Sequence, residues 1–215
     1  MIETELLGVY AGDQMPRWMC GVGLAMYDAL AGRWAHEAQS RDKIIARVPS
    51  LEGSAVEGGY RYFDAQTDDS RLTLRVLREA VKQGGTAINY VRADKLLRTA
   101  DGRVRGVVLR DTAPGASRTA EVQAKVVINA TGAWADELRA ELGQDKRLRR
   151  IRGSHLTFEH RRLPLPEAVS LLHPRDQRAV FAIPWEGVTI LGTTDVDHGA
   201  LDEEPAISDA EREYL

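Results

Sequence analysis

"FAIPWEGVTILGTTD", residues 181–195, and the earlier stretch "RIRGSHLTF", residues 150–158, have the apolar alternation of β-strands. We expect strand pairs over 151–158 and 179–193. The first stretch places Gly153, Ser154 and His155 in the middle of its alternation. A strand glycine allows close approach of another group, and an imidazole can exchange a proton near neutral pH. A flat ligand near a reactive histidine explains this pattern, and so does a surface-facing or internally bonded histidine.

The second stretch ends in "GTTD", residues 192–195, with two hydroxyls and a carboxylate after an apolar run. Such a cluster can hydrogen-bond a cofactor, or it can simply close a turn, because Thr and Asp do both.

The rest of the chain has the pattern of alternating helices and strands. Predicted helices cover 18–32, about 68–83, 133–143 and a last segment that begins with the cap pattern Ser208 and Glu211. Predicted strands cover 55–67, 86–90, a hairpin at 95–111 around Asp101-Gly102, and a short apolar run that ends at Gly132. The apolar stripes of the first two helices are expected to be Trp18, Val22, Ala25, Met26 and Ala29, and Leu72, Val76, Leu77 and Ala80.

Two local features suggest contacts. "KVVINATGAWADEL", residues 125–138, has the pattern of strand, tight turn and helix; its glycine and helix N-terminus suit an anionic ligand, and an ordinary βα unit has the same pattern. Arg71 stands in the first turn of its helix, where the helix dipole disfavours a cation. We expect it to pair with a carboxylate such as Asp64, with an anionic ligand, or in a surface salt bridge.

Composition excludes several classes of protein. The 215 residues carry a net charge of −3, which does not favour binding to nucleic acid, and the single cysteine, Cys20, allows no internal disulfide and no cysteine-based metal site. We predict no metal. "GVG" at 21–23 has neither the preceding strand nor the third glycine of a dinucleotide fingerprint. Without a signal-peptide pattern or a membrane-length apolar run, we expect a cytoplasmic protein, with at most peripheral membrane contact.

Five motifs in order resemble the FAD-dependent glycerol-3-phosphate dehydrogenase family of the aerobic, quinone-reducing type. They are "GLAMYDALAG", "GGYRYFDAQTDDSRLTLRVLREAVKQG", "VVINATGAWADEL", "IRGSHLTF" and "VFAIPWEGVTILGTTDVDH". The resemblance runs from about residue 12 to residue 215. It implies an α+β fold of the DAO-like FAD-dependent oxidoreductases, in which an α/β-type FAD-binding portion joins an antiparallel-sheet substrate domain.

The resemblance also implies an activity and site residues. Family members oxidise the C2 hydroxyl of sn-glycerol 3-phosphate, giving dihydroxyacetone phosphate, and pass electrons from FAD to a quinone, or to oxygen in oxidase relatives. By position, His155 is the candidate base, with Ser154 and Arg152 on the substrate side. The residues implied to contact the cofactor are Val91, Ala130, Gly132, Thr193, Thr194 and Asp195.

The chain departs from the family pattern at both ends. The Gly-x-Gly-x-x-Gly turn for the FAD pyrophosphate is not in it. By the family pattern, an arginine-tyrosine pair that helps to hold the substrate phosphate would precede Met1, and the arginine of an Arg-Pro-Leu segment would follow Leu215. We therefore expect an internal fragment, 1–215, that alone binds FAD weakly or not at all and is inactive. Its substrate-side sheet is expected at about 1–65 and 150–195, and partial FAD-domain elements at about 66–149.

Two other functions stay open from the residues. One is a related FAD-dependent amine or 2-hydroxy-acid oxidoreductase, against which the "YRYFDAQTDDSRL" block argues. The other is a non-catalytic binding module that retains the fold. The oligomeric state is not readable from the sequence.

Overall fold

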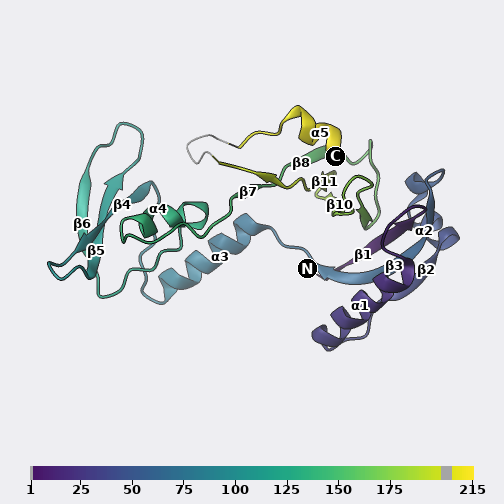
Figure 1. The fold of residues 1–215 in the computed structure, drawn as a ribbon, viewed down its shortest axis with the longest axis horizontal. Coiled ribbons are helices and arrows are strands. Elements are labelled where there is room, and N and C mark those ends of the chain that lie inside the picture. The colour runs from purple at the N-terminus through teal and green to yellow at the C-terminus, as the bar shows by residue number, and fades with distance from the viewer. Residues whose placement is uncertain (1, 200–204) are drawn as a thin grey trace. The chain divides into compact units, whose positions relative to one another are not determined.

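The computed structural model describes residues 2–199 and 205–215, with side chains from residue 5 onward. The chain divides into two compact units, which are described separately below (Figure 1). Unit 1 holds the chain up to Thr67, Arg152–Val196 and Pro205–Leu215, and unit 2 holds Asp68–Ile151 and the segment that starts at Asp197.

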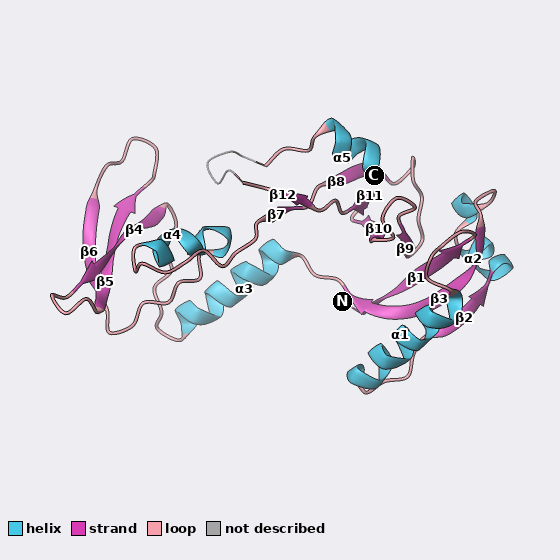
Figure 2. Cartoon of the chain, in the orientation of Figure 1, coloured by secondary structure: helices cyan, strands magenta, loops and turns pink. Residues whose placement is uncertain are grey.

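Unit 1 is built on a seven-stranded mixed sheet in the order β2-β3-β1-β9-β10-β11-β8 (Figures 1 and 2). The strands are β1 Ile2–Tyr10, β2 Glu37–Ser40, β3 Val56–Ala65, β8 His155–Glu159, β9 Ala168–Leu172, β10 Ala179–Trp185 and β11 Val188–Gly192. The predicted strands over 55–67 and 179–193 are confirmed. The stretch 151–158 forms two strands in different sheets, β7 (Ile151–Arg152) and β8, with Gly153 and Ser154 between them. The pairing of β1 with β9 is parallel and all other pairs are antiparallel, so the sheet is not purely antiparallel as the sequence predicted.

One face of this sheet carries the core of unit 1. Leu6, Val169 and Ala182 point to this face and pack with Ile44 and Val48, which come from α2 (Arg41–Arg47) and the residue after it. Ser40 caps α2 by accepting a hydrogen bond from the backbone N–H of Lys43, and a 3₁₀ turn, η1 (Pro49–Leu51), follows. Sequence analysis missed α2 because seven residues with two adjacent isoleucines show no clear helical period.

Helix α1 (Arg17–Ala31) ends at Gly32, whose φ of 65° is the left-handed conformation expected of a glycine stop. The predicted helix is confirmed, but its predicted apolar stripe is wrong: Trp18, Val22 and Met26 are exposed. The buried side is instead Cys20, Leu24 and Asp28, spaced four residues apart.

The buried carboxylate of Asp28 holds α1 in its orientation. Asp28 accepts hydrogen bonds from the backbone N–H of Ala35 (2.7 Å) and of His36 (3.0 Å), and its Oδ2 lies 2.7 Å from the His36 ring. Hydrogen bonds from the backbone of His36 and Ala35 lower the pKa of Asp28. These contacts hold α1 against Ala35 and His36, which follow it in the chain. The apolar periodicity of the helix carries no information about them.

The last helix, α5 (Asp209–Tyr214), has the capping box that the sequence predicted at Ser208 and Glu211. Its Tyr214 ring stacks on His173 with 3.8 Å between centroids, and the Tyr214 hydroxyl donates to Asp176 at 2.9 Å. These contacts dock α5 against the loop between β9 and β10.

Unit 2 contains a three-stranded antiparallel sheet, β4 (Val91–Arg98), β5 (Val104–Asp111) and β6 (Thr119–Gln123). The predicted hairpin around Asp101-Gly102 is confirmed, and Gly102 has the positive φ, 85°, that this turn needs. Helix α3 (Asp69–Lys82) is confirmed too, with Asp68 as its cap. Arg71 pairs with Asp68 at 3.4 Å, whereas Asp64 was the predicted example of a partner.

Two predicted strands of unit 2 do not form. Residues 86–90 and 125–130 run without ladder pairing, and Ile88, Val126 and Ile128 are exposed. The stripe of α3 is exposed as well, since no residue of that helix is buried. The predicted helix 133–143 is a 3₁₀ turn, η2 (Gly132–Trp134), followed by a short α4 (Ala135–Ala140).

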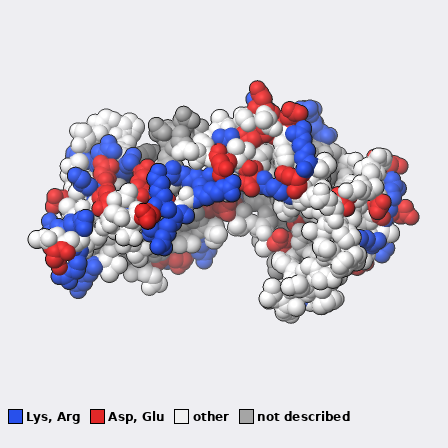
Figure 3. All heavy atoms as spheres, in the orientation of Figure 1, with Lys and Arg blue, Asp and Glu red and all other residues white. Residues whose placement is uncertain are grey.

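Two short strands, β7 (Ile151–Arg152) and β12 (Val196–Asp197), form a separate two-stranded sheet. In Figure 3, acidic and basic side chains lie next to one another over much of the visible surface. Within the described ranges, no helix has the length and apolar character to cross a membrane.

Candidate functional site

The Gly-Ser-His and Gly-Thr-Thr-Asp segments, far apart in the sequence, lie side by side in unit 1. His155 is opposite Gly192 in the β8–β11 register. Beyond that pair, the backbone N–H of Ser154 donates to Thr194 Oγ1 at 2.9 Å, and the Thr194 N–H donates to the Ser154 carbonyl at 3.3 Å. The two segments that sequence analysis singled out therefore form one local structure.

Two glycines allow this close packing. A Cβ atom on Gly192 would lie 2.4 Å from Cδ2 of His155, and one on Gly153 would lie 2.5 Å from Oγ1 of Thr193. The space beside each backbone is thus occupied by a side chain of the neighbouring segment. Gly153 lies between β7 and β8, and its close contact with Thr193 explains the glycine without invoking a ligand.

His155 stands on the face of the sheet opposite the core. Residues directly opposite one another on paired strands point to the same face, so His155, Gly192, Phe181 and Ser170 form a row across β8, β11, β10 and β9. His155 is exposed, and its ring makes no hydrogen bond to any residue within 2–199 or 205–215. An accessible imidazole is suited to accepting a proton from a bound alcohol.

Over β1, β9 and β10, the same face of the sheet has a hollow of about 230 Å³. Its lining residues are Glu5, Asp64, Ala65, Gln66, Ala168, Phe181 and Ile183. Glu5 is only 6% exposed, and its Oε1 atom has no hydrogen-bond partner among the described residues. Burial raises the pKa of Glu5, and the nearby Tyr62 and Ser170 hydroxyls oppose the shift. Sequence analysis missed Glu5, because a glutamate in a strand gives no signal of which face it occupies.

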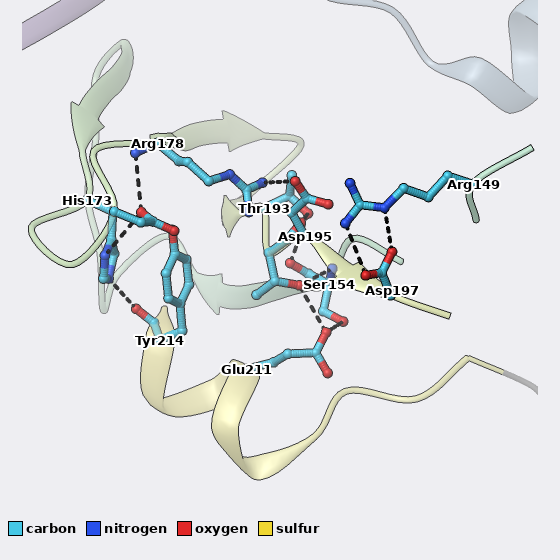
Figure 4. Close-up of polar contacts among 11 residues, drawn as sticks. Arg149, Ser154, His173, Arg178, Thr193, Asp195, Asp197, Glu211 and Tyr214 are labelled. Carbon is cyan, nitrogen blue, oxygen red and sulfur yellow. Dashed lines mark hydrogen bonds and ion pairs between the residues drawn. The ribbon is translucent and has the colours of Figure 1, made fainter. Parts of the chain in front are cut away.

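Arg152 is paired with a buried carboxylate. Its guanidinium forms an ion pair with Glu211, with 2.6 Å between Nη2 and Oε2, and the carboxylate is almost fully buried. Glu211 also accepts from the Ser154 hydroxyl at 2.8 Å (Figure 4). The Thr194 hydroxyl donates to the same carboxylate at 3.0 Å. The predicted substrate residues Arg152 and Ser154 and the predicted cofactor residue Thr194 therefore share one carboxylate.

The remaining predicted residues of unit 1 have other partners. Thr193 donates its hydroxyl to the Ser154 carbonyl at 3.2 Å. Asp195 is exposed and pairs with Arg178 at 3.0 Å (Figure 4). Both follow β11, in the short stretch before β12, where Thr193 is partly buried and Asp195 is exposed.

Three predicted cofactor residues, Val91, Ala130 and Gly132, belong to unit 2. Val91 lines a hollow of about 560 Å³ together with Thr131, Trp134 and other residues of β4 and α4. Gly132 has a φ of 55°, and no atom lies within 4 Å of where its Cβ would stand. Such a volume falls within the range of small-molecule sites, and the bare glycine leaves its backbone open to a ligand. The structure thus groups these residues separately from those of unit 1.

Similarity to known proteins covers nearly all of the chain. Residues 5–215 match the family model described as DAO, FAD dependent oxidoreductase. The chain belongs to this family. It is 33% identical over 99% of its length to an aerobic glycerol-3-phosphate dehydrogenase of Staphylococcus epidermidis, and 32% identical to one of Staphylococcus aureus. The chain spans 39% of the length of these curated relatives.

Two solved structures match the fold of the whole chain. A glycerol-3-phosphate dehydrogenase from Bacillus halodurans, complexed with FAD, matches the whole chain with a TM-score of 0.79 and 29% identity, over 38% of its own length. An L-proline dehydrogenase from P. horikoshii, at 14% identity, matches with a TM-score of 0.73 over the whole chain and 54% of its own. The second match supports the fold alone. The predicted fold class and family resemblance are confirmed.

Sequence analysis of this family member found Glu211 only as a helix cap. The capping box at Ser208 was visible as Ser-x-x-Glu, but the same carboxylate also contacts residues more than fifty positions earlier. No local pattern contains that information, because the contacts depend on where α5 docks.

Proposed function

We propose that this chain takes part in the FAD-dependent oxidation of sn-glycerol 3-phosphate to dihydroxyacetone phosphate. The observation that carries the proposal is the 33% identity over 99% of the chain to a protein named aerobic glycerol-3-phosphate dehydrogenase. The meeting of the Gly-Ser-His and Gly-Thr-Thr-Asp segments at one place of the sheet supports it.

His155 is the proposed base of this reaction. Its exposed imidazole is well placed to accept the proton of the C2 hydroxyl, and a side chain used in this way typically contributes about 100-fold or more to the rate. Ser154, the residue before it, is the proposed orienting group on the substrate side. Arg152 is the substrate-side candidate that the resemblance implied, but its ion pair with Glu211 argues against a role in binding the substrate phosphate.

Two groups of residues are proposed to contact FAD, and each is considered within its own unit. In unit 2 we assign Val91 to the adenine, because it lines a hollow of about 560 Å³. Gly132 is proposed to contact FAD through its backbone, because no atom lies within 4 Å of its Cβ position, and Ala130 is proposed as a further contact. We assign Thr193, Thr194 and Asp195 to the flavin end. The Thr194 hydroxyl is already used by Ser154 and Glu211, so this residue would contact the cofactor through its backbone. When bound, FAD supplies the acceptor for the hydride that leaves C2.

These assignments give each unit a proposed role. Unit 1 supplies the substrate side and the base, and unit 2 supplies part of the FAD-binding domain. We further propose a quinone as the electron acceptor, a cytoplasmic location and peripheral contact with the membrane. Quinone-analogue reduction measured against oxygen consumption distinguishes the acceptors, and sedimentation with liposomes tests the membrane contact.

The deciding experiment is an anaerobic titration of the full-length flavoprotein with glycerol 3-phosphate, followed by flavin absorbance. The proposal predicts bleaching by glycerol 3-phosphate and none by glycerol or 2-hydroxyglutarate at equal concentration. Bleaching by an amine or a 2-hydroxy acid instead would assign the protein to another substrate class, and a full-length protein without flavin would favour a binding module.

A further inference from the structure

Glu211 makes more side-chain contacts than any capping role requires. Oε2 accepts from the Ser208 backbone N–H (2.9 Å) and hydroxyl (2.7 Å), which completes the cap of α5. Oε1 faces away from the helix and accepts from the hydroxyls of Ser154 and Thr194, at 2.8 and 3.0 Å. One oxygen therefore serves the helix and the other serves the two segments beside His155.

The second set of contacts crosses the site. Ser154 immediately precedes His155, and Thr194 lies two residues after Gly192, against which the His155 ring packs. Because both hydroxyls donate to the same oxygen, Glu211 fixes the separation of the two segments. Hydrogen bonds to a buried, ionised carboxylate are shorter and stronger than neutral ones, so this link is stiffer than the single Ser154–Thr194 backbone pair.

Arg152 keeps Glu211 ionised. Its guanidinium lies 2.6 Å from Oε2 and 3.3 Å from Oε1, and this contact is the largest of those that hold the pKa of Glu211 well below its usual range. An anionic carboxylate accepts only, so the Ser154 and Thr194 hydroxyls must both point their protons at it. Their remaining lone pairs are thereby left for other donors.

We propose that Glu211 is a positioning residue for His155, acting through Ser154 and Thr194, and that Arg152 serves Glu211 and not the substrate phosphate. The inference rests on the proposed function, in which His155 is the base. It assigns to the last helix a part in the reaction, although no residue of α5 is proposed to touch substrate.

The test compares Glu211→Gln with Glu213→Gln in the full-length flavoprotein. Glu213 lies on the same helix, is exposed and pairs with Arg175, so it provides the same chemical change away from the site. In Glu211→Gln we expect the limiting rate of flavin reduction to fall about tenfold, since a misplacement of 1 Å can cost about 100-fold. The substrate dissociation constant stays within about twofold because Arg152 does not bind the phosphate. Glu213→Gln leaves both unchanged.

A second variant separates positioning from capping. Ser208→Ala removes cap contacts and leaves the Ser154 and Thr194 contacts, so it lowers thermal stability without lowering the reduction rate. A double cycle with Ser154→Ala should show that Glu211→Gln costs much less once Ser154 is gone. Equal rates in Glu211→Gln and wild type, a similar rate loss in Ser208→Ala, additive effects in the cycle, or a weakened substrate affinity would each overturn the proposal.

Amide hydrogen exchange gives a readout that needs no substrate. The Ser154 N–H donates to the Thr194 hydroxyl oxygen and the Thr194 N–H donates to the Ser154 carbonyl, and we expect Glu211→Gln to speed the exchange of both N–H groups at least tenfold relative to Glu213→Gln. Unchanged exchange contradicts the inference. If wild-type flavin is not bleached by glycerol 3-phosphate, the proposed function fails, and the exchange result still decides whether Glu211 holds the two segments.

Discussion

Replacing Gly192 by alanine tests whether the position of His155 matters to the reaction. The new Cβ would lie 2.4 Å from Cδ2 of the His155 ring, whereas ordinary contacts begin near 3.4 Å. The ring must therefore move by about 1 Å. Because His155 is exposed and can turn away, we expect a stability loss of only about 1 kcal/mol, the cost of an unfavourable rotamer. A base displaced by this distance can lose about 100-fold in rate.

The assay is anaerobic stopped-flow reduction of the full-length flavoprotein by glycerol 3-phosphate, with urea unfolding measured in parallel. Gly187→Ala is the matched control. Gly187 has a φ of 90° and no atom within 4 Å of its Cβ position, so alanine there costs about 1–2 kcal/mol of backbone strain without touching His155. A Gly192→Ala protein that folds normally and reduces its flavin at the wild-type rate would refute the reasoning.

Three further predictions concern unit 1. Burial raises the pKa of Glu5, so the wild-type protein loses stability as the pH rises from the pKa of the unfolded state through that of the folded state. In urea titrations, Glu5→Gln should therefore be more stable than wild type at pH 8 but not at pH 3.5. Each tenfold difference in proton affinity between the two states corresponds to about 1.4 kcal/mol. Asp28 has a lowered pKa, so the stabilisation that its carboxylate gives is present near pH 7 and is lost as the pH falls through the pKa of the folded state. Asp28→Asn should lower the melting temperature at pH 7 and make the melting temperature less dependent on acid. Equal melting curves of the two proteins at pH 7 would contradict this. Ile44→Ala should lower the free energy of unfolding by about 2–5 kcal/mol, because Ile44 is fully buried. Val22→Ala, at an exposed position of α1, should change the free energy of unfolding by no more than about 0.5 kcal/mol. Similar losses in the two variants would show that the core is misassigned.

Local chemistry made several elements predictable. Gly32 and Gly102 take positive φ angles where the sequence placed a helix stop and a hairpin turn. Asp68 and Ser208 accept backbone hydrogen bonds where caps were expected. In each case the signal and its cause lie within a few residues of each other.

The failures share a different cause. The stripe of α1 that contains Trp18 and Met26 was expected to be buried, but Asp28 binds the chain after the helix and turns the opposite side inward. Residues 86–90 and 126–128 have the composition of strands, yet within the described chain they have no neighbouring strand. Ladder formation needs a partner, and periodicity carries no information about whether one is present.

Sequence analysis singled out two segments that meet in unit 1, but it did not predict the contacts between them. The segments around His155 and Thr194 were identified from unusual residues in strands, and the structure brings them together. That Glu211 reaches Ser154 from another helix depends on tertiary docking. Arg152 shows the same limit, because its charge suggested a phosphate ligand and the fold supplies a carboxylate.

The most direct test of the account is the anaerobic reduction rate of the full-length flavoprotein by glycerol 3-phosphate, compared between wild type and His155→Asn. Asparagine retains a polar side chain but cannot accept the C2 hydroxyl proton near neutral pH. We predict rapid bleaching in wild type and a rate at least about 100-fold lower in His155→Asn, with similar substrate affinity. Equal rates in the two proteins, with flavin bound in both, would contradict the assignment of His155 as the base, and a wild-type flavin that stays oxidised would contradict the proposed substrate.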